Sequence, residues 1–195
     1  ETVGAVANQP VDGESVLTRN GLEKAERFIK FCDAFSIPLL TVTNVTGLRA
    51  NAHEERKKAL ALAKFTTTLA QVSVPRINLI AGEAYGTAAE VMNSKAIGAD
   101  FVLAWPQASV GMMDAEQAVR IMYAEEINTD KNKTALIAEK TAEYAEGQSS
   151  ALAAAKRGYI DDIIEPDATR KRLIAAYEML YGKKVTPVTK KHTAV

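Results

Sequence analysis

One glycine-containing turn holds the residue types that could stabilise a negative charge through backbone groups. The apolar run 76–81 before it predicts a short buried strand. Gly82 and Gly86 bracket the predicted turn, and residues 88–96 have the apolar spacing of a helix that Gly98 would close. The turn is therefore expected to lead a strand into the start of a helix.

The backbone amides of Gly86, Thr87 and Ala88 would lie at this helix N-terminus. Amides in a first helical turn have no partner within the helix, and the helix dipole adds positive potential there. Together they can stabilise a developing negative charge without a titratable side chain. An ordinary strand-to-helix turn of an α/β protein has the same pattern, so that alternative stays open.

Composition restricts the class of protein. The 195 residues are 47% hydrophobic, which is enough for the core of one domain, and Lys plus Arg equals Asp plus Glu at 24 each. This balance gives no indication of nucleic-acid binding. Cys32 is the single cysteine, and no apolar run approaches the length of a membrane helix, so we expect a cytoplasmic protein without a membrane span. Because the chain begins at Glu1 and runs almost directly into a predicted strand, we expect a fragment of a longer protein.

Apolar runs alternate with amphipathic segments along the chain, which predicts an α/β fold with parallel strands. Predicted strands cover residues 3–7, 39–45, 76–81, 99–105 and 109–111, with an extended stretch at 159–165. Predicted helices cover residues 20–37, 53–70, 88–96, a segment from 114, then 130–146, 149–157 and 166–181. Residues 46–48 are expected to form a turn.

Several polar and sulfur-containing residues have predicted structural roles. Asn20 and Asp114 are expected to cap helices, with Glu23 and Gln117 as their capping-box partners. Cys32 lies on an apolar helix face and is predicted to be a core thiol. Two further predictions concern packing and solvation: Trp105, Met112 and Met113 pack in the protein, whereas His53 and His192 lie on the solvated surface.

Several ordered motifs resemble the C-terminal half of the carboxyltransferase subunit of biotin-dependent acyl-CoA carboxylases, of the propionyl-CoA carboxylase beta chain type. Related biotin-dependent decarboxylases carry nearly the same motifs. The resemblance covers almost the whole chain. The motifs are 27–40 (RFIKFCDAFSIPLL), 6–10 (VANQP), 84–86 (AYG), 91–92 (VM), 104–106 (AWP), 158–164 (GYIDDII) and 190–192 (KKH).

The resemblance implies a crotonase-like α/β fold, a spiral of ββα units with flanking helices. Residues 1–182 would form the C-terminal, biotin-side carboxyltransferase domain, and 183–195 a C-terminal tail. The N-terminal domain that mainly binds acyl-CoA would lie outside this fragment, which is then expected to be inactive alone. Implied partners are that domain, a biotin carboxyl carrier protein, a biotin carboxylase and further copies of the subunit, as a dimer or a trimer of dimers.

The implied activity is carboxyl transfer between carboxybiotin and the α-carbon of a short acyl-CoA of the acetyl or propionyl type. The enolate and ureido anions of this reaction would be held by backbone amides, which map onto Thr87 and Ala88. Gly86, Tyr85 and Gly47 map onto the biotin side of the cleft, and Glu90 onto a position near the acyl group. The biotin is carried on a separate protein or domain, and no metal is implied for this domain.

The sequence departs from the family pattern at the cleft. Thr87 replaces a glycine, and Asn44 begins a loop that lacks the family's proline and aromatic residue. The family's glycines at 114 and 117 are also absent. These departures leave a biotin-dependent decarboxylase subunit and a catalytically silent structural paralogue as alternatives. A crotonase-type hydratase or isomerase is a further one, with Glu83 or Glu90 as its only candidate carboxylates.

Overall fold

A six-stranded parallel sheet forms the centre of the molecule. The computed structural model describes residues 2–8, 10 and 14–185. The main strand order is β1-β3-β5-β6-β8, and β7 pairs with the second half of β5. The strands are β1 (Gly4–Ala7), β3 (Leu39–Val45), β5 (Arg76–Tyr85), β6 (Phe101–Ala104), β7 (Ser109–Gly111) and β8 (Asp162–Ile163). This arrangement confirms the predicted α/β fold with parallel strands.

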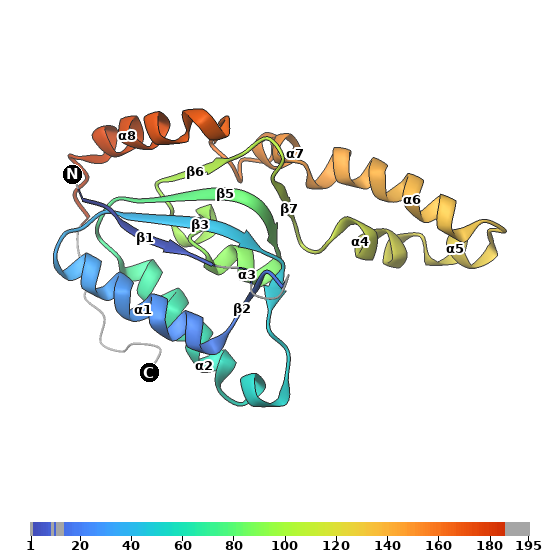
Figure 1. Cartoon of the computed structure of the whole chain (residues 1–195), viewed down its shortest axis with the longest axis horizontal. Coiled ribbons are helices and arrows are strands. Elements are labelled where there is room, and N and C mark those ends of the chain that lie inside the picture. Colours follow the sequence, from blue (N-terminus) through green and yellow to red (C-terminus); the bar gives the residue numbers. More distant parts are fainter. Residues whose placement is uncertain (1, 9, 11–13, 186–195) are drawn as a thin grey trace.

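Helices cover both faces of the sheet (Figure 1). On one face, α1 (Arg19–Ala34) and α2 (Ala52–Gln71) enclose the largest core cluster. On the other face, α8 (Thr169–Leu180) packs on β5 and β6. A further cluster, closed by α7 (Ala151–Lys156), packs on Ile80, Val102 and Ala104, which face the same side of the sheet as α1 and α2. A 3₁₀ turn, η3 (Pro166–Ala168), leads into α8. No helix in the described part of the chain is both long and apolar enough to cross a membrane.

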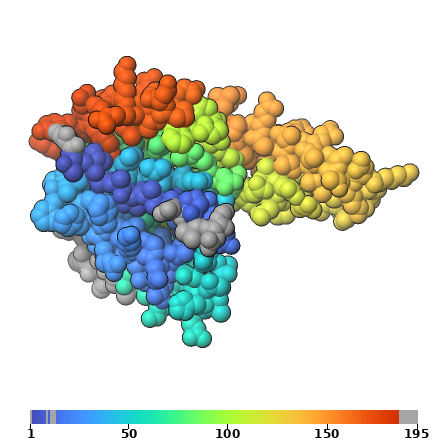
Figure 2. Space-filling model, viewed as in Figure 1, coloured from blue at the N-terminus to red at the C-terminus, as the bar shows by residue number. Residues whose placement is uncertain are grey.

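A helical arm projects from this body (Figures 1 and 2). It consists of α4 (Ala115–Met122), α5 (Ala124–Thr129), α6 (Lys133–Tyr144) and the π-helical turn η2 (Ala145–Ser149). No side chain of α6 is buried. The prediction of one helix over 130–146 was wrong in its bounds. Asp130 ends α5, and the next helix begins after Asn132.

The segment that follows the central strand differs from its prediction. β5 continues to Tyr85, so Gly82 lies inside a strand and does not open a turn. The following helix, α3 (Gly86–Val91), has only six residues. Asn93 takes a left-handed conformation with φ 62°, which ends the helix early, and Gly98 caps the 3₁₀ helix η1 (Lys95–Ile97) instead.

Other local predictions met mixed outcomes. Thr18, not Asn20, caps α1, because its hydroxyl accepts from the amide of Gly21 at 3.1 Å. The predicted turn at 46–48 contains a short strand, β4 (Gly47–Leu48), which pairs with β2 (Val16–Leu17).

Asp114 does cap α4, and Cys32 is buried, as predicted. The start of the predicted tail is anchored, since Lys183 forms an ion pair with Asp100 at 2.8 Å. The 190–192 motif and His192 lie outside the described residues.

Candidate functional site

A pocket of about 520 Å³ lies at the carboxyl end of β5 and joins three separate parts of the chain. The first part is the strand-to-helix turn, the second is the segment containing β4, and the third is the start of the arm. Its lining residues are Thr46, Gly47, Leu48, Glu83, Tyr85, Gly86, Thr87, Ala88, Met112, Met113, Asp114 and Gln117. The structure thus brings together five of the predicted site residues: Gly47, Tyr85, Gly86, Thr87 and Ala88.

Gly86 lets the chain turn from β5 into α3 at the pocket wall. Its φ is +57°, a left-handed conformation that side chains with a Cβ adopt only with strain. A Cβ at this position would also lie 3.0 Å from the backbone carbonyl oxygen of Met112. The position therefore requires glycine both for its backbone angle and for the close approach of the next pocket wall.

The amides of Thr87 and Ala88 lie in the first turn of α3. Tyr85 occupies the N-cap position in an extended conformation, with φ −117° and ψ 138°, and no side chain caps the helix. First-turn amides have no carbonyl partner within their own helix. Thr87 is exposed and Ala88 is buried, and both line the pocket. These two N–H groups can therefore donate to an oxygen atom bound there.

Tyr85 is a buried wall of the pocket. Its side chain is 5% exposed, and its hydroxyl donates to Ser109 Oγ at 2.9 Å. Burial raises the pKa of Tyr85 above its ordinary value, and the carboxylates of Glu83 and Asp114 act in the same direction, while the hydrogen bond to Ser109 opposes them. The phenol is therefore neutral at physiological pH and holds the turn against β7.

Gly47 forms the opposite side of the pocket. The neighbouring Thr46 fixes the segment, since its amide and its hydroxyl both donate to the carbonyl of Ser15, at 2.7 and 3.1 Å. A Cβ at Gly47 would meet no atom within 4 Å. Packing inside the chain therefore does not require a glycine at this position. The surface of β4 around Gly47 is open toward the pocket.

The sequence analysis counted positions 114 and 117 among the departures at the cleft, but it assigned no site role to the third wall of the pocket. Asp114 accepts from the amides of Glu116 at 2.9 Å and Gln117 at 3.4 Å. Met112 is 81% exposed at the rim, so the prediction that it packs inside the protein is wrong. The available signal was the departure from the family's glycines at 114 and 117. Together with Glu83, Asp114 gives the pocket two carboxylates.

Other candidates lie away from this pocket. Glu90 is exposed outside the lining and accepts a hydrogen bond from Ser94 Oγ at 2.8 Å. His53 is exposed on α2. Burial raises the pKa of the Cys32 thiol, which suits a core residue. Within the described residues, no cluster of three His, Cys, Asp or Glu side chains could hold a metal ion.

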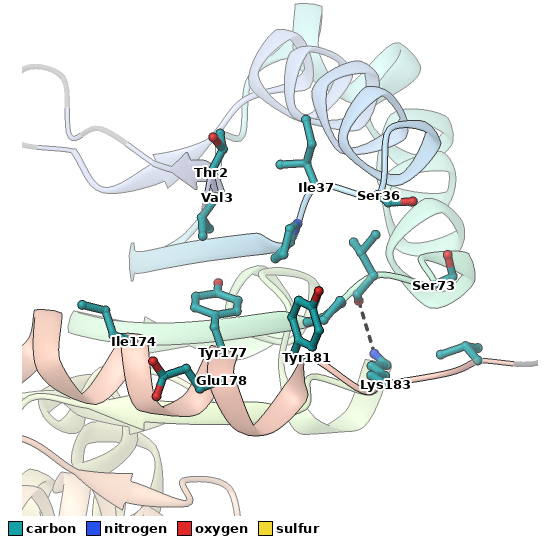
Figure 3. Close-up of a pocket in the computed structure, with 14 residues that line it drawn as sticks. Thr2, Val3, Ser36, Ile37, Ser73, Ile174, Tyr177, Glu178, Tyr181 and Lys183 are labelled. Atoms are coloured by element: carbon teal, nitrogen blue, oxygen red, sulfur yellow. Dashed lines mark hydrogen bonds between the residues drawn. The ribbon is translucent and has the colours of Figure 1, made fainter.

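A larger pocket of about 900 Å³ lies at the amino end of the sheet (Figure 3). It is lined by two interstrand loops and by the end of α8, including Tyr177 and Lys183. These polar groups already bond to the protein: the Tyr177 hydroxyl donates to the Leu39 carbonyl at 2.6 Å, and Lys183 Nζ donates to the Val74 carbonyl at 3.2 Å. Functional residues of parallel sheets gather at the carboxyl ends of strands. We therefore assign the candidate site to the smaller pocket.

Comparison with known proteins identifies relatives of this chain. The chain is 43% identical over 193 residues to a putative propionyl-CoA carboxylase beta chain of Bacillus subtilis, covering 98% of this chain and 38% of that protein. It is 38% identical to the methylmalonyl-CoA decarboxylase subunit alpha of Propionigenium modestum, covering 98% of this chain and 37% of that protein. The chain thus spans well under half the length of these relatives.

A solved structure of a related protein has the same fold as this chain. The crystal structure of transcarboxylase 12S, a hexamer with methylmalonyl-coenzyme A and methylmalonic acid bound, superposes with a TM-score of 0.92 at 36% identity. The superposition covers 97% of this chain and 37% of that chain. This match confirms the predicted crotonase-like fold. The family model described as carboxyl transferase domain matches residues 1–195, and the chain belongs to this carboxyl transferase domain family.

Proposed function

We propose that this chain is the biotin-side domain of a subunit that transfers a carboxyl group between carboxybiotin and the α-carbon of a short acyl-CoA. The observation that supports this most directly is the pair of first-turn amides, Thr87 and Ala88, which line the pocket with no side chain capping their helix. Relatives at 36–43% identity act in this chemistry by their names. Residues 1–182 would form the domain, and 183–195 its tail.

Three properties of the pocket support the proposal that it binds a biotin ring. Its volume of about 520 Å³ lies within the range of small-molecule sites. The left-handed Gly86 lets the turn approach the Met112 carbonyl closely, and the two amides provide donors of fixed direction. Biotin, when bound, supplies or accepts the transferred carboxyl group. Gly86, Tyr85 and Gly47 would form the walls around the ring.

Thr87 and Ala88 would act through their N–H groups. Donors that are already aimed at an oxygen stabilise negative charge as it develops there, because they need no reorganisation during the reaction. Removing one such donor typically costs about 100- to 1,000-fold in rate. Thr87 keeps the donor that a glycine would provide, but its Cβ narrows the approach to the pocket. Glu90, which lies outside the pocket, is the proposed contact for the acyl group.

The proposed partners follow from this chemistry. The acyl-CoA would be held mainly by an N-terminal carboxyltransferase domain. A biotin carboxyl carrier protein would deliver the ring, and a biotin carboxylase would recharge it. The subunit would assemble with copies of itself, as the transcarboxylase 12S hexamer does.

A biotin-dependent decarboxylase subunit is the second candidate. The 38% identity to a methylmalonyl-CoA decarboxylase subunit alpha favours it specifically. The residues of this chain would act in the same way in either direction, since the same oxygen atoms must be held when the carboxyl group arrives and when it leaves. The direction would be set by the other subunits.

The test measures decarboxylation of malonyl-CoA and methylmalonyl-CoA, with free biotin as acceptor, in the complete subunit that contains these residues. We expect turnover in the wild type and a severalfold faster rate in Thr87→Gly, because removal of the side chain widens the approach to the amides. Thr134→Gly is the matched control. It makes the same change at the second residue of α6, on the arm, and should leave the rate unchanged.

The other outcomes separate the alternatives. Turnover in Thr87→Gly alone would place a lost activity at this turn. Absence of turnover in both proteins, with folding and acyl-CoA binding intact, would contradict the proposed function. It would favour a structural paralogue or a crotonase-type hydratase or isomerase. Of the two carboxylates predicted for that activity, Glu83 lines the pocket and Glu90 does not.

A further inference from the structure

The central strand pair contains an irregularity just before the pocket. β3 and β5 pair in register from Leu39 to Thr43, where Thr43 faces Ile80, but Val45 faces Ala84. One residue of β3, Asn44, therefore lies opposite the three residues 81–83 of β5. Such a bulge interrupts the hydrogen-bond ladder and redirects the strand, and bulges are common beside functional sites.

The Asn44 side chain repairs the interrupted ladder. Its Oδ1 atom accepts a hydrogen bond from the amide of Glu83 at 3.0 Å. A strand amide without an acceptor is costly when it is partly buried, so this contact stabilises the bulged shape of β5. The side chain thus takes the place of the missing backbone carbonyl.

Asn44 is itself held from the other side by Asn8, the residue after β1. Asn8 Oδ1 accepts from the backbone amide of Asn44 at 2.8 Å, and Asn8 Nδ2 donates to the Asn44 carbonyl. The Asn8 side chain thereby extends the β1–β3 pairing by one step. The two asparagines form a clasp across β1, β3 and β5, which we call the asparagine clasp.

Gly82 is explained by the same clasp. A Cβ at Gly82 would lie 3.0 Å from Asn44 Cγ and 2.6 Å from Asn44 Oδ1, and the second distance is shorter than Cβ atoms adopt in proteins. Its backbone is not left-handed, so the glycine is needed for space and not for its backbone angle. The close contact shows that the Asn44 side chain packs directly over the bulge.

We propose that Asn44 is a positioning residue that fixes the end of β5 and, through it, the amides of Thr87 and Ala88. Glu83, whose amide it holds, lines the pocket, and the chain runs directly from there through Tyr85 and Gly86 to the amides. Asn44 itself does not line that pocket, so it acts through the strand. The functional part of this inference rests on the proposed function.

The experiment compares Asn44→Ala, which removes the acceptor, with Asn44→Asp, which keeps an oxygen at the same place. In the 195-residue chain, amide hydrogen exchange of residues 83–88 should accelerate about tenfold or more in Asn44→Ala, because one hydrogen bond is lost, and should recover in Asn44→Asp. In the complete subunit, kcat should fall about tenfold in Asn44→Ala while the KM for acyl-CoA changes little.

Two further variants keep the test decisive. Gly82→Ala presses a methyl group against Asn44 and should accelerate exchange at 83–88 even though Asn44 is present. Its effect should shrink in the Asn44→Ala background, since the clash is gone. Tyr177→Phe removes a partly buried hydrogen bond at the opposite end of the sheet, and is the matched control for a general loss of stability.

The readouts separate the two proposals. Equal exchange at 83–88 in Asn44→Ala and Tyr177→Phe would overturn the positioning role, whatever the activity. Faster exchange with an unchanged kcat would overturn its functional part. A wild-type subunit without turnover would contradict the proposed function, and the exchange measurement on the chain would still decide whether Asn44 fixes the end of β5.

Discussion

The two ends of the central sheet differ in whether every chain segment that begins there is bonded by a side chain. At the amino end, side chains bond the backbone where strands begin: Tyr177 donates to the Leu39 carbonyl at 2.6 Å, and Asp100 and Asp161 accept from the amides of Arg76 and Val102 at 2.8 and 2.7 Å. At the carboxyl end, the asparagine clasp bonds the backbone of β3 and β5, but the first turn of α3 that follows has no side-chain cap.

This difference indicates that contacts at the amino end of the sheet serve mainly stability, whereas free amides at the carboxyl end can serve ligand binding. Bonded strand starts add to the free energy of unfolding, because a buried backbone group that keeps a hydrogen-bond partner avoids the cost of desolvation. Amides without such partners add little to stability but can serve a bound ligand. We therefore expect substitutions at the amino end to act mainly on stability, and those at the carboxyl end to act on the site as well.

The largest effect on stability is expected at Arg76. Its guanidinium is buried and donates to the carbonyls of Leu69 and, at 2.7 Å, Ile97. Burial lowers its pKa, and the charges of Asp100 and Asp33 oppose that shift. Arg76→Met should lower the free energy of unfolding by about 3 kcal/mol, because both carbonyls lose their donor.

Urea unfolding at neutral pH measures this loss. The control is Arg120→Met, since Arg120 pairs with Glu116 on the exposed surface of the arm and its removal should change stability by no more than about 0.5 kcal/mol. A similar small change in Arg76→Met would show that the amino end does not provide the stability that its contacts indicate.

An intermediate effect is expected from Gly86→Ala at the carboxyl end. The left-handed φ of +57° and the 3.0 Å approach to the Met112 carbonyl should cost about 1–2 kcal/mol of stability. Turnover in the complete subunit should fall further than the folded fraction does, because the turn that aims the amides is displaced. Gly147→Ala is the control, as its Cβ would meet no atom within 4 Å. An equal loss of turnover and folded protein would argue against a role in the site.

The smallest effect is expected from Tyr177→Phe, at about 1 kcal/mol near neutral pH, for the lost hydrogen bond to Leu39. Burial raises the pKa of Tyr177 well above its ordinary value of 10.0, and Asp100 raises it further. The folded protein therefore holds this proton more tightly than the unfolded chain does. The contribution is complete below pH 10.0 and is lost as the pH rises above that value.

Thermal unfolding between neutral and alkaline pH checks this prediction. The wild type should lose stability more steeply than Tyr177→Phe once the pH exceeds the ordinary tyrosine pKa. Tyr181→Phe serves as control, because the Tyr181 side chain is 77% exposed and should not alter the profile. Parallel alkaline profiles for wild type and Tyr177→Phe would contradict the assignment.

Much of the framework could be predicted from sequence alone. The apolar run 39–45 coincides with β3, and the predicted cap at Asp114 and the buried Cys32 are also found. Each depends on residues close together in the chain, where side-chain periodicity and capping chemistry act directly. The first α-helix was placed with the wrong cap, because Thr18 and Asn20 are both suitable residues two positions apart.

The sequence by itself determined the family motifs, the alternation of strands and helices, and Thr87 and Ala88 as candidate donors. Only the tertiary structure decided that Glu83 lines the pocket with those donors while Glu90 lies outside it, and that Gly82 lies in a bulged strand. The contact that explains Gly82 joins Asn44 to Glu83, residues 39 positions apart. Local patterns cannot fix such pairings, because strand register depends on how distant segments pack together.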